Sequence, residues 1–175
     1  ADLVRKAKRF VIYAGAGLST ASGIGDYATS TGAASVVSTE SGAPAGFVSP
    51  YSLKPNLGHQ AVAALAQAGL VWRIVQQNHD GLLQKAGVPQ ALINEIHGCW
   101  FDPSNPVVKM DEALREDLFA DLCRVEQEAD LVLVLGSSLS GMNADRIVES
   151  SSRRAMEAAP IDNQLGSVII SLQRT

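Results

Sequence analysis

The stretch FVIYAGAGLS, residues 10–19, decides the fold of this chain. Its five leading apolar residues are followed at once by Gly15-Ala16-Gly17, a pattern typical of a buried strand that ends in a tight turn. Glycines at this spacing let the backbone approach a pyrophosphate, and a helix beginning near Ser19 would direct its N–H groups toward the anion. Thr20 stands where the dinucleotide-binding pattern has its third glycine, so an ordinary structural turn is the alternative interpretation.

Outward from this stretch, short apolar runs alternate with segments of helical periodicity. A continuous apolar run predicts a strand covered on both faces, whereas apolar residues three or four apart predict a helix. Such alternation is typical of βαβ units around a parallel sheet. The pattern predicts strands at residues 10–14, 71–75, 92–96, 131–135 and 168–172, and helices at residues 57–68, 111–129 and 143–159.

The fold class that follows is α/β, a Rossmann-like parallel sheet with helices on both faces. We expect one domain over residues 1–175. The buried face of the first long helix is predicted at Leu57, Ala61, Val62 and Leu65. In the helix over 111–129, Asp111 is the expected cap, and the inner side is predicted at Leu114, Leu118, Leu122 and Val125.

Polar side chains follow the ends of three of the predicted strands, at Gln77-Asn78-His79-Asp80, at His97 and at Ser137-Ser138. Ligands of open α/β sheets bind at the carboxyl edge, where these residues would gather. Asn78 and Asp80 are alternate residues, so an extended chain would point them to opposite sides. Ordinary roles compete with each candidate. The amide and carboxylate could bind backbone groups, the imidazole could be structural or a general base, and the serines could cap a turn.

The composition limits the classes of function that this chain can have. The 175 residues are 46% hydrophobic and 18% charged with a net charge of −4, which suits a packed domain and argues against direct nucleic-acid binding. No apolar run approaches a membrane span, and with no secretory leader visible we expect an intracellular protein. Two cysteines cannot form a disulfide framework or a four-sulfur zinc site, and the spacing of His59, His79 and His97 matches no metal site. Residues 28–55, rich in Ser, Thr, Gly, Ala and Pro, form a candidate flexible cofactor loop.

Together, these segments resemble the sirtuin family of NAD-dependent protein deacylases. The resemblance covers nearly the whole chain in the family's order. It rests on residues 15–27, 55–59, 77–82, 97–98, 106–108, 136–139 and 171–173. It implies one NAD-binding domain in which His97 is the base that relays a proton from the ribose hydroxyls and Asn78 is a second catalytic residue, in the nicotinamide pocket. It further assigns NAD contacts to Gly15, Ala16, Gly17, Ser19, Ile24, Asp26, Tyr27, Gln77, Asn78, Asp80, Gly136, Ser137, Ser138, Ser171 and Leu172.

The chain also departs from the family pattern. Ala28 stands where an arginine is usual, and Met110-Asp111-Glu112 replaces a motif of the substrate groove. The family has a zinc module with two cysteine pairs after the catalytic histidine, but only residues 99–105 lie between Gly98 and Pro106. Zinc is expected for the family, yet its ligands are not in this sequence. The module is reduced, absent or left out of the sequence, and residues 99–110 are the expected remnant of the small domain and groove.

The resemblance implies removal of acyl groups from protein lysine, giving nicotinamide and O-acyl-ADP-ribose from NAD. The expected partner is an acyl-lysine protein or peptide, without nucleic acid or membrane. A mono-ADP-ribosyltransferase or NAD hydrolase would keep the same cleavage and change the acceptor. A non-catalytic NAD or ADP-ribose sensing module is the other alternative, although such a module would need neither Asn78 nor His97. The sequence gives neither the acyl chain nor the oligomeric state.

Overall fold

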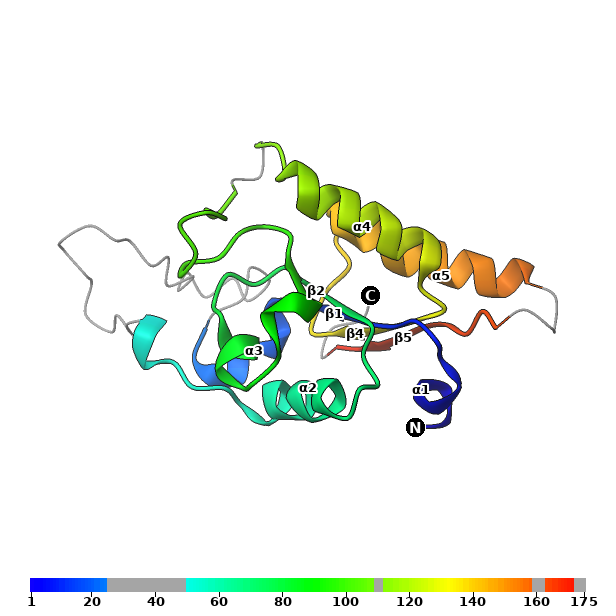
Figure 1. The fold of residues 1–175 in the computed structure, drawn as a ribbon, viewed down its shortest axis with the longest axis horizontal. Helices are drawn as coiled ribbons and strands as arrows, with labels where there is room; N and C mark the ends of the chain where they lie inside the picture. Colours follow the sequence, from blue (N-terminus) through cyan, green and yellow to red (C-terminus); the bar gives the residue numbers. More distant parts are fainter. Residues whose placement is uncertain (25–49, 109–111, 159–162, 172–175) are drawn as a thin grey trace.

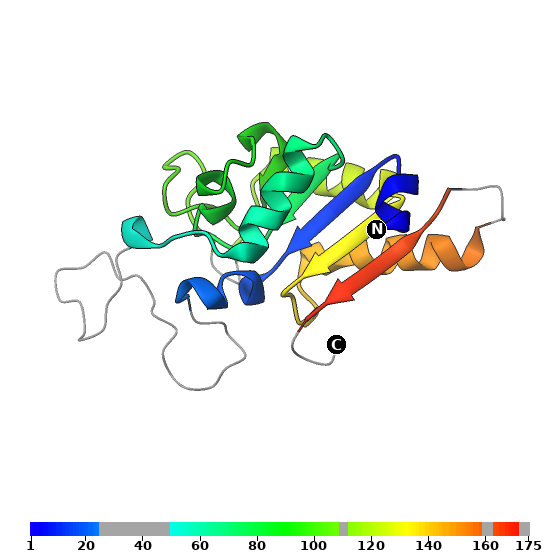
Figure 2. The ribbon, with the colours of Figure 1, turned by 90° about the horizontal axis from the view of Figure 1, so that it is seen from below.

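The computed structural model describes residues 1–24, 50–108, 112–158 and 163–171. In these ranges five parallel strands form one sheet in the order β3-β2-β1-β4-β5, and Figure 2 shows β1, β4 and β5 side by side. The strands are β1 (Phe10–Ala14), β2 (Arg73–Gln76), β3 (Ile93–Glu95), β4 (Leu131–Leu135) and β5 (Gly166–Ile170).

Helices cover both faces of the sheet (Figure 1). One face carries α1 (Asp2–Lys6), α2 (Leu57–Gln67) and α3 (Leu82–Lys85), and the other carries α4 (Glu116–Glu128) and α5 (Arg146–Glu157). Short 3-10 turns connect them, namely η1 (Ala16–Leu18), η2 (Thr20–Ser22), η3 (Pro50–Ser52), η4 (Gln90–Leu92) and η5 (Asn143–Asp145). The predicted fold class is therefore confirmed. Among the described helices, none has the length and apolar character needed to cross a membrane.

Strand β1 supplies side chains to both layers of the core. Successive side chains of a strand point to opposite faces, so Phe10 and Ile12 pack with α2 and α3, while Val11 and Tyr13 pack with α4 and α5. All five residues of β1 are fully buried. This explains why a continuous apolar run, without alternation, marks the central strand.

The predicted elements are present, but several begin or end elsewhere. The helix predicted over 111–129 begins at Glu116, so Leu114 precedes it, and Asp111 lies outside the described residues. The acidic pair Glu116 and Asp117 in the first turn suits the positive end of the helix dipole and sets this start. The helix predicted over 143–159 begins as η5 and continues as α5 from Arg146. The last strand is Gly166–Ile170 because it pairs residue for residue with β4.

The predicted inner face of α2 was partly wrong. Leu57 is 79% exposed and Ala61 is exposed, whereas the buried residues of this helix are His59, Val62, Ala63 and Ala66. Both sides of this helix carry apolar residues, so periodicity alone could not choose between them. The true face is rotated toward a histidine, which a hydrophobic pattern does not count.

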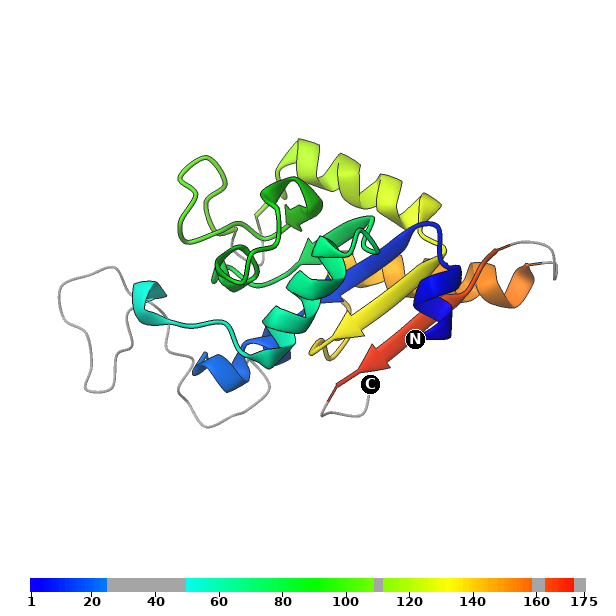
Figure 3. The same ribbon diagram turned by 60° about the horizontal axis from the view of Figure 1, so that its bottom comes forward.

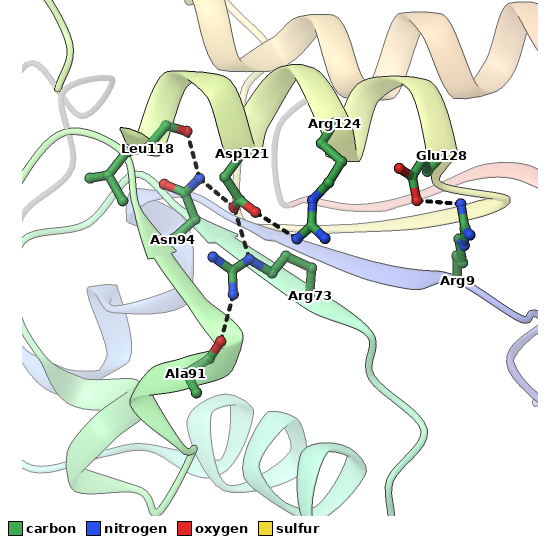
Figure 4. A network of polar contacts seen from close by, with 8 residues as sticks. All are labelled: Arg9, Arg73, Ala91, Asn94, Leu118, Asp121, Arg124 and Glu128. Carbon is green, nitrogen blue, oxygen red and sulfur yellow. Dashed lines mark hydrogen bonds and ion pairs between the residues drawn. The ribbon is translucent and has the colours of Figure 1, made fainter. Parts of the chain in front are cut away.

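A polar network ties β2 and β3 to α4 (Figure 4). The Asp121 carboxylate accepts hydrogen bonds from Arg73 Nε, Asn94 Nδ2 and Arg124 Nη2, each at 2.8 Å. Burial raises the pKa of Asp121, but these three donors together hold it below its ordinary value of 3.8. The carboxylate thus fixes the helix to the edge of the sheet while it is ionised.

We expect Asp121→Ala to lower the free energy of unfolding by about 2–4 kcal/mol, because a buried amide and a half-buried guanidinium lose their acceptor. A carboxylate with a lowered folded-state pKa stabilises above its unfolded pKa, and that contribution is lost as the pH falls through the folded value. The difference between wild type and variant should therefore shrink below pH 3.8. Urea unfolding at pH 7 and at acid pH measures both effects.

Asp117→Ala on the same helix is the matched control. Asp117 is exposed and pairs only with the neighbouring Arg115 among the ion pairs of the described residues, so its removal should cost no more than about 1 kcal/mol, from that exposed pair and from the helix dipole. Equal midpoints for wild type and the Asp121 variant at pH 7 would show that the network does not stabilise the sheet edge.

Candidate active site

The loops that follow β1 and β4 pack backbone against backbone. Gly15 N donates to Leu135 O at 2.9 Å and Gly17 N donates to Gly136 O at 2.8 Å. A Cβ added at Gly17 would lie 2.8 Å from Gly136 O, and one added at Gly136, where φ is +67°, would lie 2.2 Å from Leu18 N. The glycines are thus required first for contact between the two loops. At this point the sheet connections run in opposite directions, the position where open α/β sheets bind ligands.

A buried polar cluster lies directly beyond the glycine turn. Ser19 Oγ donates to Asp80 Oδ2 at 2.5 Å and accepts from Asn78 Nδ2 at 3.0 Å. All three residues are at most 9% exposed. The chain does not stay extended here, because it bends at Asp80 before α3, and the side chains of Asn78 and Asp80 both meet Ser19.

The same side chains also bind backbone groups, as the alternative interpretation held. Asn78 Nδ2 donates to Gly15 O at 3.0 Å, and Asp80 Oδ1 accepts from Leu82 N at 2.9 Å. Each residue therefore joins the glycine turn or the start of α3 to the polar cluster. These contacts use both N–H groups of Asn78 Nδ2, so a ligand would meet Asn78 Oδ1 and the remaining lone pairs of the Asp80 carboxylate.

His59 completes the cluster, and sequence reasoning missed it. Its Nε2 lies 3.3 Å from Ser19 Oγ, while Nδ1 accepts from Asn56 N at 3.3 Å. An accepting Nδ1 assigns the proton to Nε2, which then donates to the serine. Burial lowers the pKa of His59, with Asp80 opposing the shift, so the ring is neutral at pH 7. The signal in the sequence was the Asn-x-x-His spacing of a capping box at the start of α2.

The parallel strands end at one edge of the sheet (Figure 3), and His97 follows β3 at that edge. Burial and then the neighbouring His79 lower the pKa of His97, while a hydrogen bond with the Gln77 backbone and the charge of Asp145 oppose the shift. The ring is therefore neutral at pH 7 and able to accept a proton. It is only half-buried, so a reactant can reach it.

The Gln77 amide is held by a second buried hydrogen-bond chain. Its Nε2 donates to Tyr13 Oη at 2.5 Å, and Tyr13 Oη donates to Asp145 Oδ1 at 2.6 Å. Ser137 Oγ approaches Gln77 Oε1 at 3.4 Å. Burial, with Asp145, raises the pKa of Tyr13, which keeps its proton in place. Sequence reasoning counted Tyr13 only as a strand residue, although a buried phenol requires a hydrogen-bond partner.

The remaining predicted site residues lie in turns and loops that follow the strands, or outside the described residues. Ala16 lies in η1 and is half-buried, as are Ile24 after η2 and Ser171 after β5, while Ser138 is exposed. Asp26, Tyr27 and Leu172 lie outside the described residues, as does the predicted cofactor loop over 28–55 except for its last part, which contains η3. Of the segment 99–110, residues 99–108 are described and form a short loop.

A zinc site does not fit the residues present. Cys99 is buried in the loop after β3 and Cys123 lies on α4. The part of the chain that the structure describes holds no cluster of three or more His, Cys, Asp or Glu side chains that could bind a metal ion. No step of the chemistry below therefore uses a metal.

Known proteins resemble this chain at two levels. No family-wide sequence profile matches it. An NAD-dependent protein deacetylase of Sulfurisphaera tokodaii is 30% identical over 192 residues, covering 83% of this chain and 76% of that protein. The NAD-dependent protein deacetylase sirtuin-7 of Mus musculus is 37% identical over 98 residues, which is 56% of this chain and 24% of the relative. The chain thus spans about a quarter of the length of the sirtuin-7 relatives that it matches.

The fold is shared with solved structures. One of them is a structure of Sir2 in complex with the inhibitor EX-527, 2′-O-acetyl-ADP-ribose and a deacetylated p53 peptide. The two structures align over 99% of this chain and 86% of the Sir2 chain, with a TM-score of 0.77 and 24% sequence identity. The relationship to the Sulfurisphaera deacetylase extends over most of both chains. This chain therefore belongs to the sirtuin family.

Proposed function

We propose that this chain is an NAD-dependent protein deacylase, which transfers the acyl group of a modified lysine to ADP-ribose and releases nicotinamide. The convergence of Asn78 and Asp80 on Ser19, on the same sheet edge as His97, carries the proposal. The relatives in the comparison are named NAD-dependent protein deacetylases. Loss of nicotinamide builds positive charge on the ribose, so the reaction needs fixed polar groups and a base more than a strong acid.

The residues present fit NAD as the reactant. We assign its pyrophosphate to the turn at residues 15–19, beside the crevice between the β1 and β4 loops. Support comes from the buried cluster, whose hydrogen-bond directions are already set before NAD binds, and preorganised polar groups are what stabilise developing charge. We assign the nicotinamide end to Ala16, Ile24, Asn78 and Asp80. Asp26, Tyr27 and Leu172 complete the assignment from the sequence resemblance alone.

The two ribose groups are assigned to the next part of this edge. Gln77 is proposed to contact the nicotinamide ribose, since its amide is fixed by Tyr13 and Ser137. Gly136, Ser137 and Ser138 are proposed to face the second ribose and the phosphates, with Ser171 beside them. His97 is the proposed base, since its lowered pKa leaves the imidazole unprotonated. It accepts a proton from the ribose hydroxyl that receives the acyl group.

We propose that residues 1–175 form one NAD-binding domain and that 99–110 are the remnant of the substrate-groove region. The loop from 99 to 105 between Gly98 and Pro106 is short, so little protein is present there to hold a peptide. This favours, as a second candidate, an NAD hydrolase or mono-ADP-ribosyltransferase that uses the same cleavage with another acceptor. Like the activity, the intracellular location remains a prediction.

An assay with NAD, with and without an acetyl-lysine peptide, separates the candidates. We expect nicotinamide release that depends on the peptide, together with O-acetyl-ADP-ribose detected by mass spectrometry. In His97→Ala, acyl transfer should fall by about 100-fold or more, because general-base catalysis is lost, while NAD affinity measured by calorimetry is largely kept. Peptide-independent nicotinamide release would favour the hydrolase, and NAD binding without any release would contradict both enzymes.

The pH dependence of acyl transfer should report the neutral form of His97. Since its pKa is lowered below 6.5, activity should be constant near pH 7 to 8 and should fall as the pH drops through the lowered value. The positive charge of His79 contributes to that lowering. In His79→Gln the midpoint should therefore move to higher pH. A midpoint that does not move, or moves down, would contradict the placement of these two rings.

Ser19→Ala tests the polar cluster without removing a proposed base. The variant leaves a buried Asp80 carboxylate oxygen without its donor, so we expect a loss of about 1–3 kcal/mol in unfolding free energy and weaker NAD binding. Urea unfolding and NAD titration measure the two effects. Ser140→Ala, at an exposed serine on the loop after β4, is the control and should match wild type. A Ser19 variant as stable as wild type would show that the hydroxyl does not organise the cluster.

A further inference from the structure

A cavity of about 420 Å³ lies between α3 and the loop that follows β3. Its lining includes Gln84 and Lys85 of α3, Glu95 at the end of β3, and Cys99, Phe101 and Asp102 of the loop. None of these residues belongs to the NAD assignment above. The volume lies in the range of pockets that bind small molecules.

One oxygen of a buried carboxylate in this lining is unused. Glu95 is 3% exposed, and its Oε2 accepts from Gln90 Nε2 at 3.1 Å. Its Oε1 is buried and has no N–H or O–H donor among the described residues; the Cys99 thiol, a weak donor, is the group hydrogen-bonded to the Glu95 carboxyl. A buried carboxylate oxygen without a donor is costly, so this atom indicates a missing donor.

A second residue of the lining also has a buried acceptor without a donor. Gln84 Oε1 is buried without a partner in the described part of the chain, while Gln84 Nε2 donates to Gln90 Oε1 at 3.0 Å. Turning the Gln84 amide over would place two carbonyl oxygens together. Turning Gln90 as well would remove the donor from Glu95 Oε2. The chain of amides therefore fixes both orientations, and the two unused atoms are both acceptors.

The charges around the cavity are net negative. The lining carries two carboxyl groups, Glu95 and Asp102, against one ammonium, that of Lys85, and hydrogen bonds from Ser104 lower the pKa of Asp102. Burial and the Glu95 carboxylate raise the pKa of Cys99 to about 11, so its thiol stays neutral. The Lys85 ammonium lies 5.1 Å from the Phe101 ring centre and donates to the carbonyls of Tyr51 and Leu53.

We propose that this cavity binds a small organic cation with at least two N–H donors, a guanidinium or a primary ammonium. Such a group supplies donors to Glu95 and Gln84 and offsets the excess of negative charge. The site goes beyond the proposed NAD chemistry, and its test does not depend on that chemistry.

Methylguanidinium chloride is the probe, and N-methylurea is its neutral counterpart of the same shape. We expect saturable shifts of the backbone amide signals of residues 81–85 and 99–102 in ¹H–¹⁵N spectra, at constant ionic strength. Methylguanidinium should bind at least about tenfold more tightly than N-methylurea, because hydrogen bonds to a charged donor are the stronger ones. No saturable shift, or equal affinity for the two probes, overturns the proposal and leaves water as the missing donor.

Two variants locate the binding. Glu95→Gln should weaken methylguanidinium binding by about tenfold or more, with the fold checked from the same spectra. Gln84→Leu, at a half-buried position of α3, gives a second test should the buried variant not fold, and it should weaken binding several-fold. Glu128→Gln, at a carboxylate that pairs with Arg9, is the control and should bind like wild type. Unchanged binding in a folded Glu95 or Gln84 variant also overturns the proposal.

The cation can come from a free small molecule or from an arginine side chain of a peptide. N-acetylarginine methylamide separates these sources, because it carries the guanidinium on a peptide backbone. Affinity at least equal to that of methylguanidinium identifies a peptide side chain as the ligand. Loss of binding with this compound, while methylguanidinium still binds, identifies a free cation.

Discussion

The rest of the site depends on the contact between two loop backbones, the glycine turn after β1 and Gly136 after β4. Here Gly17 Cα and Gly136 Cα approach so closely that neither position has room for a Cβ. Any side chain would push the loops apart and move η1 and η2, which flank Ser19. A constraint between adjacent strands thus places the hydroxyl on which the polar cluster converges. The phosphate-binding role of the glycines, expected from the sequence, requires the same lack of side chains and comes second.

Ser19 then acts as the centre of a directional network. Its single proton goes to Asp80, so the oxygen can only accept from Asn78 and from the protonated Nε2 of His59. This order of donors fixes the neutral tautomer of His59, with Nε2 protonated and Nδ1 accepting from Asn56 N. A buried polar network that is only partly hydrogen-bonded is costly. A polar ligand therefore binds most favourably where it pairs with the donors and acceptors that the network leaves without a hydrogen bond. The network therefore links the stability of the fold to the proposed binding of a carboxamide.

The sequence predicted what local patterns determine. The central strands, their polar ends and the fold class follow from apolar runs and from the rule that carboxyl ends share one edge. Three features depend on the tertiary structure and could not be predicted from local patterns. The buried face of α2 includes His59, which hydrophobic periodicity cannot select. Asn78 and Asp80 converge because the chain bends before α3. Tyr13, within β1, accepts a hydrogen bond from the Gln77 amide, and no residue near Tyr13 in the sequence indicates that partner.

The segment after the proposed base shows how a short connection can still shape two sites. Gly98 has φ +91°, and a Cβ there would lie 2.2 Å from Pro106 O, so the chain turns back directly on itself. Hydrogen bonds from Cys99 N to Asn105 O and from Val108 N to His97 O close the loop. The closed loop holds the His97 backbone on one side and presents Cys99, Phe101 and Asp102 to the cavity on the other. Because both are built on one hydrogen-bonded loop, a ligand in the cavity would contact the segment that directly follows His97. The two sites are therefore joined through covalent neighbours, not through a long path of packed side chains.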